Sequence, residues 1–180
     1  PELNDEFAKA MDYDSLDDLR QAVERSLAAT KEREVRNDLE QQLFSALLDR
    51  VKIELPEGIL KAQARSIMMR QNYRLQQRGV PAEEIEKHLE ELRNASEEAA
   101  ARNLRIFFLL DRIADKEKIF VTETDVENRI ASMAAAYRTT PQKMRAQIEN
   151  ENSLAELRAG MREDRVVEFL LKNASITDEK

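Results

Sequence analysis

A run without glycine or proline, from residue 16 to residue 51, constrains this chain more than any other feature. Aliphatic side chains recur along it mostly at steps of four residues, which is the spacing of an α-helix. They are Leu19, Val23, Leu27, Val35, Leu39, Leu43, Leu47 and Val51. Such a helix would be about 54 Å long, whereas a compact domain of this size is about 40 Å across. The sequence therefore predicts a long spine helix over 15–53 and an elongated domain.

The composition also favours an all-α fold. Only three of the 180 residues are glycine and four are proline, which is too few for the tight turns of β-sheet proteins. Hydrophobic residues make up 42% of the chain, enough for a folded core, and charged residues make up 36%. So high a charge content suits helices with much solvated surface. We therefore predict an elongated multi-helix domain with six or seven helices and no strand.

Breaks and cap residues predict where the first helices begin and end. Residues 1–14 show no helical period and are predicted to form an extended lead-in. Ser15 is the predicted N-cap of the long helix, with Asp18 placed as in a capping box. Pro56 is predicted to open the next helix, and Gly79 is predicted to end it, because glycine readily adopts the left-handed conformation that follows a helix.

Five later helix starts are predicted from N-cap residues and prolines. They lie at Val80–Pro81, Asn94–Ser96, Thr122, Pro141 and Ser153. The first of these helices is predicted to be short, with Leu89 and Leu92 on its apolar face. At the last one, Glu156 follows Ser153 by three residues, which predicts a second capping box.

One packing contact is also predicted between distant segments. The second half of the long helix presents leucines, among them Leu47, near one face. A matching apolar face is predicted on the helix that carries Leu110, with Ile106, Leu109 and Ile113. We predict that these two helices pack together.

Charge and glycine spacing exclude several classes of function. The net charge is −7 and no Lys/Arg-rich block is present, so we predict no nucleic-acid partner. No apolar run approaches the roughly 18 residues of a membrane span, so we predict no membrane partner. Gly58, Gly79 and Gly160 are too far apart for a phosphate-binding loop, so an ATP-driven mechanism is not expected.

The residue types that catalysis and metal binding require are scarce. The sequence has no cysteine and one histidine, which excludes disulfides, thiol nucleophiles and Cys/His zinc sites. His88 lies in a run of charged residues and is interpreted as facing solvent. Adjacent glutamates such as Glu90 and Glu91 do not face each other on a helix. We predict no catalytic residue, no cofactor and no metal.

Several methionine and tyrosine residues are candidates for a binding surface, because these side chains adapt to many partners. Core packing is the commoner role for any one of them. An elongated helical body has little interior, however, so some of them should line grooves between helices. The candidate polypeptide-binding residues are Ile67, Met68, Met69, Tyr73, Met133, Tyr137 and Met144.

An ordered set of segments resembles the C-terminal domain of the trigger factor family. The opening PELNDEFAK at 1–9 and SLDDLRQAV at 15–23 resemble the entry to that domain. The segment VKIELPE at 51–57 resembles the point where its long helix ends and its first arm begins. VTETDVENRI at 121–130 and RVVEFLLKNASIT at 165–177 resemble its later part. The resemblance spans nearly the whole chain.

The resemblance implies a cytoplasmic, ATP-independent chaperone domain over 1–180 that binds unfolded or nascent polypeptides and prevents their aggregation. It implies arm and core helices over 56–118, and a second arm and C-terminal helix over 122–180. The family's ribosome-docking and prolyl isomerase domains have no counterpart here. Ribosome docking is therefore expected only through a domain outside this sequence, and isomerase activity is not expected. Self-association is left open.

Two alternatives stay open from the sequence. One is a SurA-like periplasmic chaperone domain, which shares the general fold and whose pattern overlaps mainly with 121–177. The other is a helical scaffold or coiled-coil adaptor with a single defined partner. Binding to many unrelated unfolded proteins would distinguish a chaperone from an adaptor.

Overall fold

The computed structural model describes residues 3–177, so residues 1–2 and 178–180 of the sequence-based segments lie outside it. Within the described residues there are no strands, which confirms the all-α prediction, and eight helices instead of the predicted six or seven. Contacts divide the chain into two compact units, one ending at Leu47 and one beginning at Leu48. The helices are α1 Asp5–Ala10, α2 Leu16–Arg50, α3 Glu57–Gln77, α4 Ala82–Lys87, α5 Leu89–Lys116, α6 Glu123–Ala136, α7 Pro141–Asn150 and α8 Leu154–Asn173.

The predicted long helix is present as α2. It begins after Ser15, whose Oγ accepts a hydrogen bond from the backbone N–H of Asp18 at 3.2 Å, as the N-cap prediction required. The charged stretch 30–38 is solvent-exposed throughout. Such a polar stretch does not need a packing partner on any face. The elongated form of the domain and its treatment as one unit over 1–180 stay predictions.

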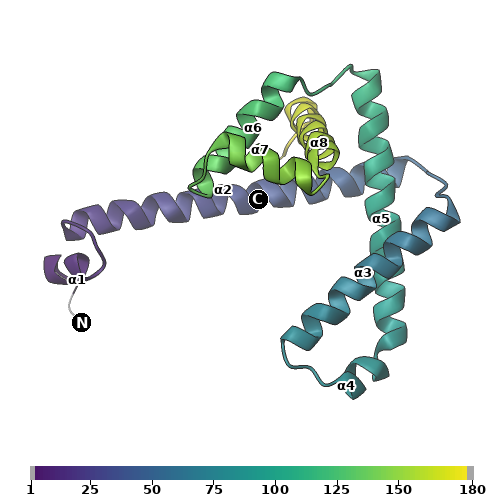
Figure 1. Cartoon of the computed structure of the whole chain (residues 1–180), viewed down its shortest axis with the longest axis horizontal. Coiled ribbons are helices and arrows are strands. Elements are labelled where there is room, and N and C mark those ends of the chain that lie inside the picture. The colour runs from purple at the N-terminus through teal and green to yellow at the C-terminus, as the bar shows by residue number, and fades with distance from the viewer. Residues whose placement is uncertain (1–2, 178–180) are drawn as a thin grey trace. The chain divides into compact units, whose positions relative to one another are not determined.

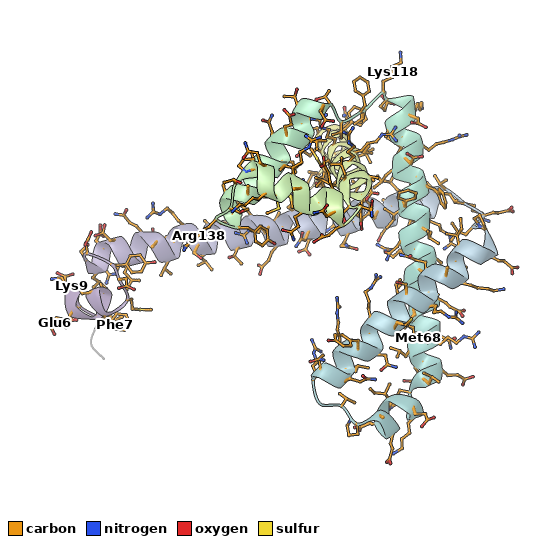
Figure 2. The ribbon with its side chains drawn as sticks, viewed as in Figure 1. Glu6, Phe7, Lys9, Met68, Lys118 and Arg138 are labelled. Carbon is orange, nitrogen blue, oxygen red and sulfur yellow. The ribbon has the colours of Figure 1, made fainter. Side chains whose placement is uncertain are left out.

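The predicted extended lead-in is wrong for residues 5–10, which form α1 (Figure 2). Asn4 caps this helix by accepting a hydrogen bond from the N–H of Phe7 at 3.0 Å. Asp5 in turn accepts a hydrogen bond from the N–H of Leu16 at 2.9 Å, and Ala8 is fully buried. A six-residue helix is too short to show a period, so only the Asn4 cap signalled it in the sequence.

The helices α3, α4 and α5 form a hairpin, with α4 at its tip (Figure 1). The two long helices pack through Ala64, Ile67 and Ala100. The two alanines are small and allow the backbones to lie close together. Helix α3 ends as predicted at Gly79, which has φ of 80°. The N–H of Val80 bonds to the carbonyl of Leu75, closing a Schellman motif.

The predicted helix boundary at Asn94–Ser96 is wrong, because α5 already starts at Leu89 and runs through these residues. The break lies instead at His88, which joins α4 to α5. Leu89 and Leu92 therefore belong to the long helix and not to the short one. Ser96 does not act as a cap, since its hydroxyl donates to the carbonyl of Leu92, one turn back in the same helix, at 2.7 Å.

The helices α6, α7 and α8 form a second apolar core in the same unit. Val126, Ile130 and Ala134 of α6 meet Met144 and Ile148 of α7 in this core. Side chains of α8 pack against them at Leu154, Leu157 and Met161. Both predicted starts are confirmed: Thr122 forms a capping box with Asp125, and Pro141 occupies the first turn of α7.

The predicted capping box of Ser153 and Glu156 does not form. Ser153 precedes α8, but its side chain makes no cap hydrogen bond. Its hydroxyl donates instead to the carbonyl of Glu151 at 3.4 Å. The preceding Asn152 has φ of 54°, and the N–H of Ser153 bonds back to Ile148. The tight link between α7 and α8 therefore fixes Ser153 in a conformation from which it cannot cap the next helix.

Helix α5 connects the hairpin to the second core by packing against α8. Leu110 and Ala114 of α5 are buried and line a small cavity of about 80 Å³ together with Val166 of α8. The structure thus gives Leu110 a partner on α8. Its predicted packing against the Leu47 face of the long helix stays a prediction.

Among residues 3–177, four helices end with a non-glycine residue in the left-handed conformation, which is costly for side chains with a Cβ atom. They are Asp12, Lys118, Arg138 and Asn152. Arg138 follows α6 with φ of 52°, and Figure 2 shows it at the end of that helix.

We expect Arg138→Gly to raise the free energy of unfolding by about 0.5–1 kcal/mol, measured by urea denaturation. Gly79→Ala is the opposite control and is expected to destabilise the protein. A destabilised Arg138→Gly variant would contradict this account.

Candidate functional site

The first exposed apolar surface lies on α3. Met69 is 64% exposed and Tyr73 is 63% exposed, and they stand one turn apart on the same face of the helix. Arg65 lies one further turn towards the N-terminus and extends this row with a charged group. Two large apolar side chains next to each other on an exposed helix face make the row a candidate contact surface.

The other two predicted residues of α3 lie on a different face. Ile67 is only 8% exposed because it belongs to the core between α3 and α5. Met68 is half-buried and lines a groove between the same two helices. Ile67 therefore stabilises the hairpin, whereas Met68 is reachable only from the groove. The prediction grouped these residues with Met69 because they are adjacent in sequence. Adjacent residues of a helix point in different directions, so they do not share one surface.

The second exposed surface lies at the end of α6. Tyr137 is 74% exposed directly after the last turn of this helix. Met133, one turn earlier, is half-buried against the core of α6, α7 and α8. Met144 is 7% exposed and belongs to that core. Among the three predicted residues of this region, the structure leaves only Tyr137 fully available to a partner.

Phe120 is an exposed aromatic residue that sequence reasoning missed. It lies in the link between α5 and α6 and is 67% exposed. Its neighbours Ile119 and Val121 are half-buried, since successive side chains of an extended segment point to opposite sides. The sequence signal that could have identified Phe120 is the run of three apolar residues between two predicted helices. Phe120 joins Met69, Tyr73 and Tyr137 as a candidate contact residue.

A row of arginines on α8 fixes the link that carries Phe120. Arg162 donates to the carbonyl of Ile119 at 3.0 Å and pairs with Asp111 and Asp115 of α5 at 2.6 and 2.5 Å. Arg165 donates to the carbonyl of Phe120 at 2.6 Å. These charge-assisted hydrogen bonds tie α8 to the end of α5 and to the link itself.

Ion pairs of two acidic residues, Glu123 and Asp125, hold the start of α6. Glu123 pairs with Arg158 of α8 and with Arg145 of α7, and hydrogen bonding to Arg145 is the main cause of its lowered pKa. Asp125 accepts hydrogen bonds from the hydroxyl and the backbone N–H of Thr122, and it pairs with Arg165 at 2.6 Å. The Thr122 hydroxyl bond is the largest cause that lowers the pKa of Asp125 from 3.8 to about 2.

This lowered pKa predicts how acid acts on α6. A carboxylate whose pKa is lower in the folded state stabilises the fold above pH 3.8, and this stabilisation is lost as the pH falls towards 2. We expect an NMR titration of the Asp125 carboxyl to give a midpoint near 2. Thr122→Val should raise this midpoint more than Arg165→Gln does, because the Thr122 bonds are the larger cause. A midpoint near 3.8 in the parent would contradict the capping geometry.

The acidic and histidine side chains of residues 3–177 are spread over separate helices. No group of three or more acidic, histidine or cysteine side chains there is placed to hold a metal ion. The side chain of His88 is 65% exposed and pairs with Glu91 at 3.0 Å, which matches its interpretation as a solvent-facing residue. Over the same residues, no helix has the length and hydrophobicity needed to cross a membrane.

Comparison with known proteins shows which family this helical domain resembles. The model of the family described as bacterial trigger factor protein C-terminus matches residues 15–172. Trigger factor of Lysinibacillus sphaericus is 30% identical over 99% of this chain and 42% of its own length. Trigger factor of Desulfatibacillum aliphaticivorans is 32% identical over 77% of this chain and 32% of its own length.

Two solved structures share the fold. Trigger factor from Thermotoga maritima superposes with a TM-score of 0.62 at 19% identity, covering 79% of this chain and 84% of that one. A second trigger factor chaperone, whose structure concerns promiscuous substrate recognition, gives a TM-score of 0.52 at 20% identity, covering 96% of this chain and 43% of that one. At these identities the likeness shows the fold alone.

The fold is therefore that of an all-helical trigger-factor-type domain. The chain belongs to the trigger factor C-terminal family, as the resemblance of its ordered segments indicated. The match favours this family over the SurA-like alternative. The chain spans less than half the length of the curated relatives it matches, namely 42% and 32% of the two named above.

Proposed function

We propose that this domain binds unfolded or nascent polypeptides without ATP and prevents their aggregation. The observation that carries the proposal is the set of large exposed apolar side chains on a domain of the trigger factor family. Met69, Tyr73, Phe120 and Tyr137 are each more than 60% exposed. A related trigger factor chaperone is described as recognising its substrates promiscuously, which agrees with such a surface.

The chemistry of these side chains suits partners of many sequences. A site built from fixed hydrogen bonds rejects most partners, because unmatched polar groups are costly to bury. Methionine adapts its shape, and tyrosine contributes a large contact area with few rotatable bonds. Each contact is weak alone, but several on one chain reinforce each other when they bind one extended polypeptide. The charged side chains around these residues keep the domain in solution when no polypeptide is bound.

The setting of this activity is part of the proposal. We propose that the domain works in the bacterial cytoplasm as one part of a longer protein, since the matching relatives are more than twice as long. Ribosome docking and prolyl isomerisation would belong to other parts of such a protein. The domain itself is proposed to catalyse no reaction. Neither nucleic acid nor membrane is among its proposed partners.

An aggregation assay with unfolded polypeptides, here called clients, tests this function. Several unrelated clients would be diluted from denaturant with and without an equimolar amount of the domain, and light scattering would be followed. We expect scattering to fall for all clients, equally with and without ATP, and His88→Ala is expected to protect them as well as the parent. Protection of only one client would favour an adaptor, and no protection would contradict the proposal.

A further inference from the structure

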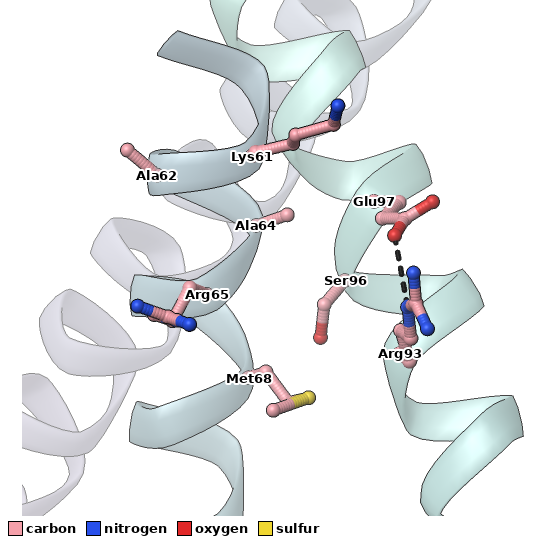
Figure 3. A pocket seen from close by; sticks show the side chains of 8 residues that line it. All are labelled: Lys61, Ala62, Ala64, Arg65, Met68, Arg93, Ser96 and Glu97. Atoms are coloured by element: carbon pink, nitrogen blue, oxygen red, sulfur yellow. Dashed lines mark hydrogen bonds and ion pairs between the residues drawn. The ribbon is translucent and has the colours of Figure 1, made fainter. Parts of the chain in front are cut away.

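A groove of about 590 Å³ runs between α3 and α5 beside their shared core. From α3 it is lined by Lys61, Arg65 and Met68, which lie on one side of the helix at steps of four and three residues. Arg93 and Glu97 line it from α5 (Figure 3). This volume is within the range of about 300–1,000 Å³ that ligand sites occupy.

Small residues at the bottom of the groove explain why it is open. Ala64 of α3 and Ser96 of α5 lie among the lining residues, and both are buried. Ser96 is 1% exposed, and its hydroxyl is already used by the carbonyl of Leu92 and by Gln71 of α3. Its polar group is therefore satisfied and does not compete for a ligand. The groove thus offers a small-residue floor, one methionine and a charged rim.

The rim carries more positive than negative charge. Three of its side chains are cationic and one, Glu97, is a carboxylate. Arg93 pairs with Glu97 at 3.1 Å, and Lys61 pairs with Glu57 at 2.9 Å, in both cases one turn apart and exposed. Such pairs are weak and exchange readily with a ligand. Arg65 has no ion pair among residues 3–177. This excess of positive charge contrasts with a chain of net charge −7.

We propose that this groove selects client segments in which an acidic side chain accompanies an apolar one. The inference rests on the proposed chaperone function and assigns a preference to one part of its surface. The apolar side chain would contact Met68, and the client carboxylate would pair with Arg65, whose planar guanidinium holds carboxylates through two hydrogen bonds. Lys61 would add a second cation at the same rim.

The groove continues into the exposed surface of α3. Arg65 lies one turn before Met69 and two turns before Tyr73. A client segment bound along this face would therefore meet a cation first and large apolar groups next. The remaining surface of an acidic domain attracts basic segments through long-range charge, which salt screens over about 8–10 Å. The groove would let the same domain hold acidic segments that the rest of its surface repels.

The test uses two fluorescently labelled peptides that share all apolar residues and differ only in carrying three aspartates or three lysines. Their binding would be measured by anisotropy at about 0.15 M salt, so that distant charges are screened. The test variant is K61Q/R65Q. The matched control is R105Q/R112Q, which removes the same charge from exposed positions of α5 outside the groove.

We expect K61Q/R65Q to bind the aspartate peptide about threefold to tenfold more weakly than the control does, the size expected of two exposed ion pairs. Both variants should bind the lysine peptide alike. In the parent, the methyl NMR signal of Met68 should shift when the aspartate peptide is added. A charge reversal, K61E/R65E, should bind the lysine peptide more tightly than the control does.

Equal loss in the test and control variants, or an unshifted Met68 signal, would overturn the inference. Displacement of the aspartate peptide by single-stranded RNA at the same charge concentration would also overturn it, because the groove would then be a general anion site. These outcomes are separable from the proposed function. Aggregation assays on the same variants would still show client protection if only the acidic preference is wrong.

Discussion

Leu110→Ala is expected to lower the free energy of unfolding by about 2–5 kcal/mol. Leu110 is 2% exposed and lies where α5 packs against α8. It adjoins a cavity of about 80 Å³ that Val166 also lines. Leu110→Ala removes the three carbon atoms beyond Cβ and enlarges that space. The surrounding side chains recover the lost contacts only in part, which is the usual outcome at a buried leucine.

The measurement should report on this junction and not on the whole chain, because the chain forms two units. Amide hydrogen exchange in α5 and α8 under increasing urea serves this purpose. Arg112→Ala, at an exposed position of the same helix, is the control and is expected to stay within about 0.5 kcal/mol of the parent. A Leu110→Ala variant that matches the control would show that α5 and α8 do not pack as described.

The second large effect is expected from Ile130→Ala, again about 2–5 kcal/mol. Ile130 is 2% exposed in the core shared by α6, α7 and α8. Its neighbours Val126 and Met144 are also buried there. Because α7 has only ten residues, it has little intrinsic stability and depends on this packing. We therefore expect α7 to lose its exchange protection together with α6.

Arg129→Ala is the matched control for this core, since Arg129 is the exposed neighbour of Ile130 on the same helix. Its effect is expected to stay within about 0.5 kcal/mol. If Ile130→Ala lowered protection in α6 while α7 stayed protected, the second core would not be cooperative. That result would require a separate source of stability for α7.

Helix boundaries could be predicted where a local signal is sufficient. Thr122 and Pro141 start helices as predicted because capping and proline geometry depend only on neighbouring residues. The capping box predicted at Ser153 does not form, because the left-handed Asn152 before it fixes the backbone of the link. The cap predicted at Ser96 does not form, because its hydroxyl donates to a carbonyl inside the helix. In both cases a contact outside the cap pattern determined the outcome.

The candidate surface was harder to predict, because burial depends on which helices meet. Met69 and Met144 are the same residue type and both lie on helices, yet one is 64% exposed and the other 7%. Met144 is buried by α6 and α8, whose approach depends on packing that the local sequence does not encode. Phe120 is exposed because Arg162 and Arg165 hold its link from 43 and 45 residues away. Tyr73 and Tyr137 were predicted as candidate binding residues, and their exposure now supports the proposal.

The most direct test of the account compares two triple variants, one that removes a large apolar area and one that removes little. M69S/Y73S/Y137S truncates three of the exposed candidate contact residues. Q77S/A135S/Q142S places serine at exposed positions of α3, α6 and α7 and removes little apolar surface. With helicity verified by circular dichroism, we expect the first variant to need about tenfold or more protein to suppress client aggregation. The second should match the parent, and equal protection by both variants would contradict the account.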